Sequence, residues 1–152
     1  MMHLKTKDYL FVGIQFLLFL LFIIDFAWIK LLLPNIIKIV AAIIALSGLV
    51  VLLLAILQLN RNLSPFPSPK SNSELVQTGL YKFIRHPIYT GILLSFFGYA
   101  FFTESFFRVL ITIFLYILFL YKLKYEEKML ADRFENYSNY KKKTGRFFPK
   151  LF

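Results

Sequence analysis

Two uninterrupted apolar runs near the start of the chain constrain the fold more than any other feature of the sequence. They cover residues 9–33 and 36–59, with Pro34 and Asn35 between them. A helix needs about 20 apolar residues to cross the hydrocarbon core of a bilayer. We therefore predict two membrane-spanning helices that form a hairpin, in an integral, multi-pass membrane protein.

Two shorter apolar stretches follow in the second half of the chain. They cover residues 88–102 and 106–121, with a polar break at 103–105, and they predict a second hairpin. Residues 60–74 are rich in proline and serine, so we expect an extended linker in water. Apolar residues continue at near-helical spacing beyond residue 121, which predicts a C-terminal amphipathic helix. The predicted fold class is an all-α membrane protein with about four transmembrane helices in two hairpins.

The distribution of basic residues predicts how the chain lies in the membrane. Fifteen of the 18 Lys and Arg residues fall in the N-terminus, residues 60–88 and the C-terminal tail, while the other side carries Lys30, Lys38 and Arg108. This bias places both termini in the cytoplasm by the positive-inside rule. The tail at residues 141–143 is all lysine, so we expect it to contact anionic lipid headgroups. Nucleic acid is not an expected partner, because the aromatic residues lie in membrane spans and form no stacking module.

Several residue types exclude particular chemistries. The chain has no cysteine, which excludes disulfides, thiolate nucleophiles and Cys-ligated metals. His3 is a lone terminal histidine without a second ligand nearby, so no metal site is expected. Asp25 lies inside the first apolar run, where an acid is costly, and we expect it to pair with Lys30 or another cation.

An arginine, a histidine and a proline stand directly before the third apolar stretch, in the sequence FIRHPIYTG at residues 83–91. Pro87 suits the first turn of a helix, because that position needs no amide donor. Arg85 and His86 alone are typical of interfacial anchors. The free amides of a helix start, together with Arg85, would also bind a carboxylate. Tyr89 follows His86 by one turn, so it can face the same pocket.

Glu126 and Glu127 directly follow the fourth apolar stretch. One interpretation is a solvated helix in which Lys122 pairs with Glu126. The other places both acids near His86 and Tyr89, because the start and the end of a helical hairpin meet at one depth. A cavity with a basic, aromatic side and an acidic side can hold a zwitterion.

Together these motifs resemble those of membrane-embedded methyltransferases of the isoprenylcysteine carboxyl methyltransferase and phospholipid methyltransferase group. The shared pattern is roughly G-x-Y-x-x-x-R-H-P-x-Y, then E-E-x-x-L, then F-x-x-Y-x-x-Y. In this chain the pattern consists of Gly79, Tyr81, Arg85, His86, Pro87, Tyr89, Glu126, Glu127, Leu130, Phe134, Tyr137 and Tyr140. The match extends over residues 75–149, and the combined spacing is more specific than any one motif.

The resemblance implies S-adenosylmethionine-dependent methyl transfer to a lipid-like or membrane-partitioned acceptor. The reaction would be carboxyl O-methylation of an isoprenylcysteine-like group or N-methylation of an aminolipid. The implied cofactor-binding residues are Leu75, Val76, Gly79, Tyr81, His86, Pro87, Ile88, Tyr89 and Glu126. Arg85 and Glu127 are implied as catalytic residues and Lys122 as a substrate contact. Lys122 stands where prenylcysteine-type members usually carry an arginine, and a lysine lacks the bidentate fork of that residue.

The resemblance also suggests how one domain over residues 1–152 is organised. Residues 1–59 would be a two-helix scaffold, residues 60–74 a linker and residues 75–149 the cofactor-binding core, with the active site facing the cytoplasm. A soluble Rossmann-type methyltransferase is not expected, because no G-x-G-x-x-G motif follows a strand. A non-catalytic membrane scaffold and an anionic-lipid-binding adaptor of the same fold remain alternatives.

Overall fold

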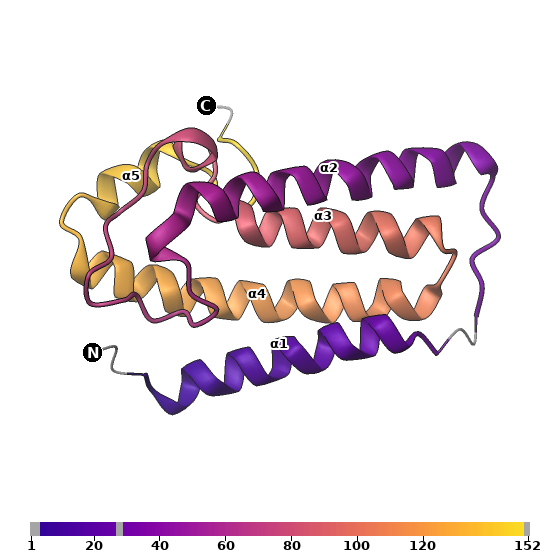
Figure 1. The fold of residues 1–152 in the computed structure, drawn as a ribbon, viewed down its shortest axis with the longest axis horizontal. Helices are drawn as coiled ribbons and strands as arrows, with labels where there is room; N and C mark the ends of the chain where they lie inside the picture. Colours follow the sequence, from indigo (N-terminus) through magenta and orange to yellow (C-terminus); the bar gives the residue numbers. More distant parts are fainter. Residues whose placement is uncertain (1–3, 27–28, 151–152) are drawn as a thin grey trace.

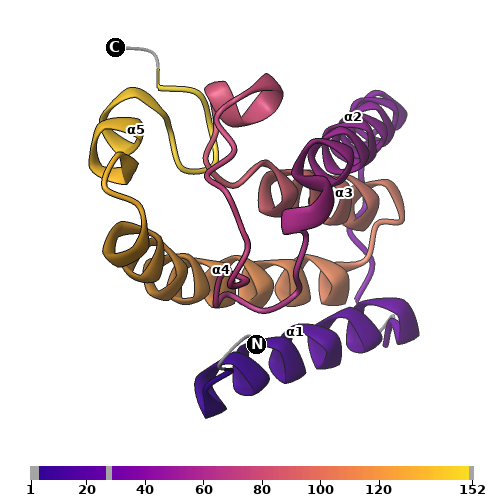
Figure 2. The ribbon, with the colours of Figure 1, turned by 60° about the vertical axis from the view of Figure 1, so that its left-hand side comes forward.

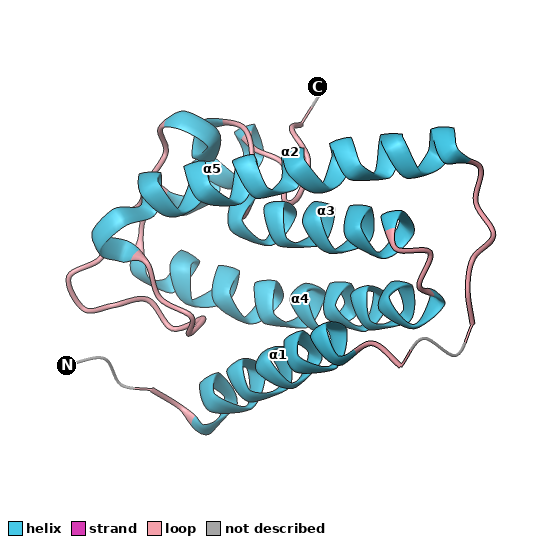
Figure 3. Ribbon diagram, turned by 45° about the vertical axis from the view of Figure 1, so that its right-hand side comes forward, coloured by secondary structure: helices cyan, strands magenta, loops and turns pink. Residues whose placement is uncertain are grey.

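The structure, a computed structural model, describes residues 4–26 and 29–150, and its regular structure is helical (Figure 3). Four long helices are present: α1 (Thr6–Ile24), α2 (Asn35–Leu59), α3 (Pro87–Phe102) and α4 (Phe106–Arg133). Shorter pieces are the 3-10 turns η1 (Asn60–Asn62) and η2 (Gly79–Lys82) and the helix α5 (Tyr137–Lys143). Within the described ranges the only β pairing is two isolated bridges. The predicted all-α fold class is confirmed.

In the part of the chain that the structure describes, three helices are long and apolar enough to cross a membrane: α1, α2 with its η1 extension, and α4. Helix α3 is apolar but has only 16 residues. Its rise of about 24 Å falls short of a hydrocarbon core of roughly 30 Å. Most of α3 packs on protein, since Tyr99 and Phe102 are its only exposed residues. The chain is therefore a membrane protein whose shortest apolar helix is also its most enclosed one.

The helices pack in the order α2, α3, α4, α1, as Figure 1 shows. The predicted first hairpin is therefore wrong, because α1 and α2 lie on opposite sides of the α3–α4 pair. Helix α1 ends at Ile24, well before the predicted end at residue 33. The connection to α2 is hydrogen-bonded to the α3–α4 turn: Leu31 N–H donates to the carbonyl of Glu104 at 2.8 Å, and Leu33 N–H donates to Glu104 Oε1 at 3.1 Å. The chain thus passes from α1 on one side of the α3–α4 pair to α2 on the other side.

Side-chain size decides which helix lies next to α3. A Cβ atom on Gly98 would lie 2.4 Å from the backbone nitrogen of Ala45, and one on Gly48 would lie 2.4 Å from that of Ser95. Small residues at such positions let two helix backbones approach closely. Helix α1 instead meets α3 through large rings, with Phe22 stacked on Phe96 (centroid distance 4.1 Å). Helix α2 is thus the close neighbour of α3.

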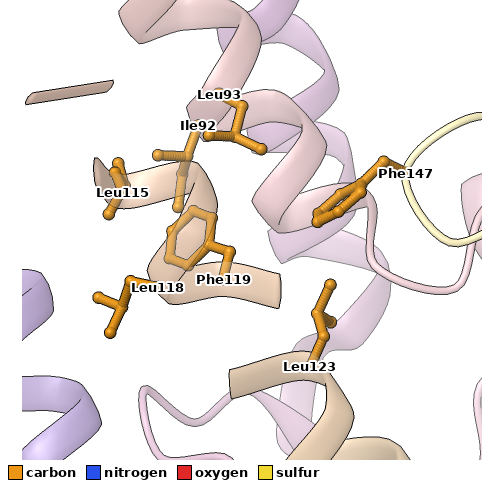
Figure 4. Close-up of a cluster of buried hydrophobic side chains, with 7 residues drawn as sticks. All are labelled: Ile92, Leu93, Leu115, Leu118, Phe119, Leu123 and Phe147. Carbon is orange, nitrogen blue, oxygen red and sulfur yellow. The ribbon is translucent and has the colours of Figure 1, made fainter. Parts of the chain in front are cut away.

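The main core joins α3, α4 and the C-terminal segment (Figure 4). Its buried residues are Ile92 and Leu93 of α3, Leu115, Leu118, Phe119 and Leu123 of α4, and Phe147. Thr90 Oγ1 donates a hydrogen bond to the carbonyl of Phe147 at 2.8 Å, which fixes the C-terminal segment against α3. The chain after α5 is therefore part of the core and not a free tail.

The bundle has two distinct ends. The start of α1, the segment between α2 and α3, the end of α4 and α5 gather at one end, which we call the tail end (Figures 1 and 2). The other end, the Asp25 end, holds the α1–α2 connection and the α3–α4 turn. There Asp25 Oδ2 lies 2.9 Å from Arg108 Nη1, and Ser105 Oγ donates to Asp25 Oδ1 at 2.6 Å. The predicted pairing of Asp25 with a cation is confirmed, and the cation is Arg108.

Candidate active site

A pocket opens at the tail end of the bundle, between the start of α3, the end of α4, α5 and the segment that follows α2. Eight of the residues predicted from the sequence line it: Leu75, Val76, Tyr81, Arg85, His86, Ile88, Tyr89 and Glu126. The family-pattern residues Leu130, Phe134, Tyr137 and Tyr140 line it as well. Motifs far apart in the sequence thus face one cavity.

The start of α3 places a histidine in the pocket wall. Pro87 occupies the first helical position, and His86 caps the helix in a non-helical conformation, as predicted. The His86 ring is 5% exposed and stacks on Tyr89 with a centroid distance of 5.8 Å. His86 Nδ1 lies 3.9 Å from Glu126 Oε1, while Nε2 lies 3.5 Å from Glu127 Oε1 and has no closer hydrogen-bond partner among the described residues. This buried nitrogen therefore has unused hydrogen-bonding capacity.

The two adjacent glutamates face different surroundings. Glu126 lines the pocket and accepts a hydrogen bond from the Tyr89 hydroxyl at 3.0 Å. Glu127 lies outside the pocket lining, and its side chain is 4% exposed. Its oxygens lie 2.9 Å from Lys141 Nζ and 3.2 Å from Arg146 Nη2. Glu126 is thus available to a ligand, whereas Glu127 holds the C-terminal segment.

Arg85 lines the pocket, but its guanidinium group is already engaged. Nε donates to Glu127 Oε1 at 3.0 Å, and Nη1 donates to the carbonyl of Lys141 at 3.1 Å and to that of Thr144. The Arg85 backbone N–H also donates to the carbonyl of Gly145 at 2.9 Å. Arg85 and Glu127, predicted as catalytic, therefore form an ion pair that ties residues 141–146 to the start of α3. Their catalytic roles stay predictions.

Gly79 and Pro87 are predicted cofactor-binding residues that do not line the pocket. Gly79 has φ +58°, in the left-handed region that favours glycine. The turn that it begins is held to α2, because Leu80 N–H donates to Gln58 Oε1 at 2.8 Å. This turn brings Tyr81 to the pocket. Gly79 therefore shapes the pocket wall by permitting the turn and does not line the cavity itself.

Lys122, the predicted substrate contact, does not line the pocket. Its side chain is 1% exposed, and Nζ donates to Gln15 Oε1 at 2.7 Å and to the carbonyl of Pro65 at 2.9 Å. A buried ammonium group needs such acceptors, and here they come from α1 and from the segment after α2. The ammonium group also lies over the Tyr89 ring, 5.4 Å from its centroid. Lys122 therefore supports the pocket wall from behind.

Two tyrosines of the family pattern differ in their hydroxyl contacts. The Tyr140 hydroxyl donates to the carbonyl of Tyr81 at 2.6 Å. Tyr137 is 1% exposed, and its hydroxyl has no partner among the described residues. Burial raises the pKa of Tyr140 to about 12, against the opposing effect of the Arg85 charge, and burial raises the pKa of Tyr137 well above its usual value. Both phenols are therefore neutral donors at pH 7.

Nine residues of the pocket wall, all within the predicted linker at 60–74, were not identified from the sequence. Half of the lining residues belong to the predicted linker and the residues just beyond it: Asn62, Ser64, Phe66, Pro67, Ser68, Pro69, Lys70, Ser73, Glu74, Leu75 and Val76. The prediction of a linker extended in water is wrong, because this segment folds back over the start of α3 and the end of α4. Its proline and serine content is equally typical of exposed linkers, so no pattern in the segment itself indicated a wall.

The pocket combines features that suit a small charged ligand with a flat ring. It offers carboxylates at Glu126 and at the exposed Glu74, the buried His86 ring, a hydroxyl at Tyr137 without a partner among the described residues, and aromatic walls. Such a set of a few polar groups in a mostly apolar cavity is typical of small-molecule and cofactor sites. An ammonium group fits Glu126 best, because a charge-assisted hydrogen bond is about twice as strong as a neutral one.

Comparison with known proteins agrees with these features. Residues 36–137, more than half of the chain, match the phospholipid methyltransferase family profile. The chain is 40% identical over 73 residues to methanethiol S-methyltransferase of Pseudomonas deceptionensis, covering 47% of this chain and 27% of that protein. It is 34% identical over 86 residues to the cobalt-zinc-cadmium resistance protein CzcN of Cupriavidus metallidurans, covering 55% of this chain and 39% of that protein. The chain thus matches less than half of the length of these relatives.

The fold is shared with a solved structure, that of the eukaryotic intramembrane Ras methyltransferase ICMT (isoprenylcysteine carboxyl methyltransferase). The TM-score is 0.67 at 20% sequence identity, and the match covers 97% of this chain and 54% of that chain. The resemblance inferred from the sequence motifs is thereby confirmed at the level of family and fold. This chain belongs to the phospholipid methyltransferase family of membrane methyltransferases.

Proposed function

We propose that this chain transfers a methyl group from S-adenosylmethionine to a lipid-like or membrane-partitioned acceptor. The reaction is O-methylation of a carboxyl group or N-methylation of an aminolipid. The observation that carries the proposal is the pocket at the tail end, whose lining brings together Glu126, His86 and Tyr137. Membership of a methyltransferase family supports the same reaction.

In this proposal each part of the pocket binds one part of the cofactor. Glu126 binds the ammonium group, and the Tyr89 hydroxyl holds Glu126 in place. The start of α3 faces the cofactor carboxylate, because free amides at a helix N-terminus attract anions. Leu75 and Val76 line the adenosine, and the unpartnered atoms of His86 and Tyr137 supply hydrogen bonds to it.

In the proposed reaction the protein needs only to position the cofactor and the acceptor and to exclude water from the site. The cofactor supplies a methyl group already activated on a sulfonium. Transfer to a neutral or anionic acceptor disperses or cancels that positive charge, so a site that holds the partners in line and excludes water favours it. The residues of the pocket bind and orient the partners, and no covalent nucleophile is needed.

The rest of the chain takes supporting roles in the proposal. Residues 1–59 are a scaffold and residues 75–149 the cofactor-binding core, with the pocket facing the cytoplasm. The exposed lysines of α5 contact anionic headgroups. We add residues 62–74 to the proposed cofactor site, because nine of them line the pocket.

The proposal is tested by titrating the detergent-purified protein with S-adenosylmethionine. Wild type should bind saturably, Glu126→Ala should lose about 100-fold in affinity and His86→Ala about tenfold, from the loss of charged and neutral hydrogen bonds respectively. Glu104→Ala, which removes a carboxylate at the Asp25 end, is the matched control and should bind like wild type. If Glu126→Ala and His86→Ala bind S-adenosylmethionine with wild-type affinity, the site is assigned wrongly.

The acceptor is found by incubation with methyl-labelled S-adenosylmethionine and a total membrane extract. Label in a lipid identifies the acceptor and the methylated atom, and the same reaction with Glu126→Ala should yield none. Intact cofactor binding without any label would favour a non-catalytic protein of the same fold.

A further inference from the structure

The pocket wall formed by residues 63–76, which we call the cover, is attached to helix α1. We propose that Asp8 of α1 is a positioning residue that latches the cover through Ser68, so that the cofactor exchanges when this latch opens. The identity of the ligand rests on the proposed function, whereas the latch itself is a property of the ligand-free protein. Helix α1 would then control the site, although it contributes no residue to the pocket lining.

Asp8 is a fully buried carboxylate in the first turn of α1. It accepts hydrogen bonds from the N–H of Lys5 at 2.7 Å, the N–H of Ser68 at 3.2 Å and the hydroxyl of Ser68 at 2.8 Å. Among the described residues no Lys, Arg or His forms an ion pair with it. A buried charge is costly unless its oxygens are hydrogen-bonded, so Asp8 favours the position of the cover in which Ser68 is close.

Two further contacts attach the same part of the cover to α1. The rings of Tyr9 and Phe66 meet edge to face with a centroid distance of 5.4 Å. Lys122 of α4 bridges Gln15 of α1 and the carbonyl of Pro65. Residues 65–68 are therefore held from three positions along α1, one of them through Lys122 of α4. Within this stretch Phe66, Pro67 and Ser68 line the pocket.

Ser68 Oγ also lies 3.4 Å from Met129 Sδ of α4, in a partly buried contact. The remaining side-chain hydrogen bonds that attach the cover are exposed to water. Asn62 exchanges two hydrogen bonds with the backbone of Glu74, at 3.1 and 3.2 Å, and the Arg133 guanidinium donates to the carbonyls of Lys70 and Ser71. Exposed hydrogen bonds compete with water, whereas breaking a buried one leaves a desolvated group unpaired. The buried Asp8–Ser68 pair is accordingly the contact whose loss most favours an open cover.

Hydrogen exchange of the ligand-free, detergent-purified protein tests the latch without any cofactor. In Asp8→Asn and Ser68→Ala, the amides of residues 63–76 should exchange about tenfold faster, since a charged hydrogen bond is worth roughly 1.5 kcal/mol or more. Ser71→Ala changes an exposed serine of the same cover and should exchange like wild type. Ser68→Ala removes only a hydroxyl group, so it decides the question even if Asp8→Asn fails to fold. Unchanged exchange in the latch variants would overturn the proposal.

Cofactor release tests the consequence for the site. Asp8 does not line the pocket, so its effect on bound S-adenosylmethionine must pass through the cover. The dissociation rate constant should rise about tenfold in Asp8→Asn, whereas Ser71→Ala should release the cofactor like wild type. Faster amide exchange with unchanged release would overturn the link between latch and cofactor. Absence of S-adenosylmethionine binding by wild type would refute the proposed function, and the exchange experiment would still decide the latch.

Discussion

The two ends of the bundle both place charges among buried side chains, but they satisfy them differently. At the Asp25 end, Arg108 pairs with Asp25 at 2.9 Å and donates Nε to the carbonyl of Phe22 at 3.2 Å. Buried polar atoms without a partner occur, within the described residues, only toward the tail end, on His86, Tyr125 and Tyr137. Buried polar groups in native proteins are normally paired. At the Asp25 end the charges are thus paired within the fold, whereas two of the three residues with an unpaired buried atom, His86 and Tyr137, line the pocket.

The largest stability effect is expected from Glu127, because it balances several cations. Glu127→Ala should lower the free energy of unfolding by about 3 kcal/mol, since it leaves the buried Arg85 without its carboxylate. Protease cleavage within residues 141–150 should become faster, because the same carboxylate holds Lys141 and Arg146. Denaturant unfolding in detergent measures the first effect. Glu104→Ala, which breaks a more exposed pair with Lys38, should cost less than about 1 kcal/mol, and equal losses in the two variants would contradict this assignment.

An intermediate effect is expected at the Asp25 end. Asp25→Ala should lower the free energy of unfolding by about 2 kcal/mol, because Arg108 and Ser105 both lose a partly buried acceptor. The affinity for S-adenosylmethionine should stay within about twofold of wild type, since such a change is only a few tenths of a kcal/mol. A stability measurement and a binding titration on the same preparation check both values. A large loss of affinity would mean that the two ends are coupled.

The smallest stability effects are expected from a matched pair of tyrosines at the tail end. Tyr140→Phe should cost about 1 kcal/mol of stability, because its hydroxyl bonds the carbonyl of Tyr81. Tyr137→Phe should leave stability within about 0.5 kcal/mol of wild type, because it removes a hydroxyl that has no partner. Tyr137→Phe should instead weaken cofactor binding several-fold in a titration. The reverse pattern, with Tyr137 important only for stability, would remove it from the proposed site.

The helix starts were predictable because local residues specify them. Helices α2 and α3 begin beside Pro34 and Pro87, and prolines suit a helix start. Helix α4 begins after Ser105, whose side chain caps it by accepting from the N–H of Arg108. The end of α1 was not predictable, since residues 25–33 keep an apolar composition. Asp25 leaves the helix with φ +47° to meet Arg108, and that contact depends on the tertiary fold.

The site was predictable only where motif spacing carries it. The positions of His86, Tyr89 and Glu126 followed from the resemblance, and the structure brings them into contact. The cover and the surroundings of Lys122 depend on partners far away in the chain, such as Asp8 for Ser68 and Gln15 for Lys122. No local pattern identifies such partners. For the same reason the sequence predicts only a scaffold role for α1.

The shortness of α3 has a consequence for the kinetics of the proposed reaction. At the Asp25 end the α3–α4 turn is hydrogen-bonded to the α1–α2 connection, and α3 rises only about 24 Å from there, less than a hydrocarbon core of roughly 30 Å. With the Asp25 end at one membrane surface, the pocket end of α3 would lie inside the opposite edge of the lipid layer. An acceptor with an apolar tail would reach this depth by lateral diffusion without leaving the bilayer. The rate would then follow the mole fraction of acceptor in the membrane and not its bulk concentration. Adding inert lipid at constant protein and acceptor should slow the enzyme by surface dilution.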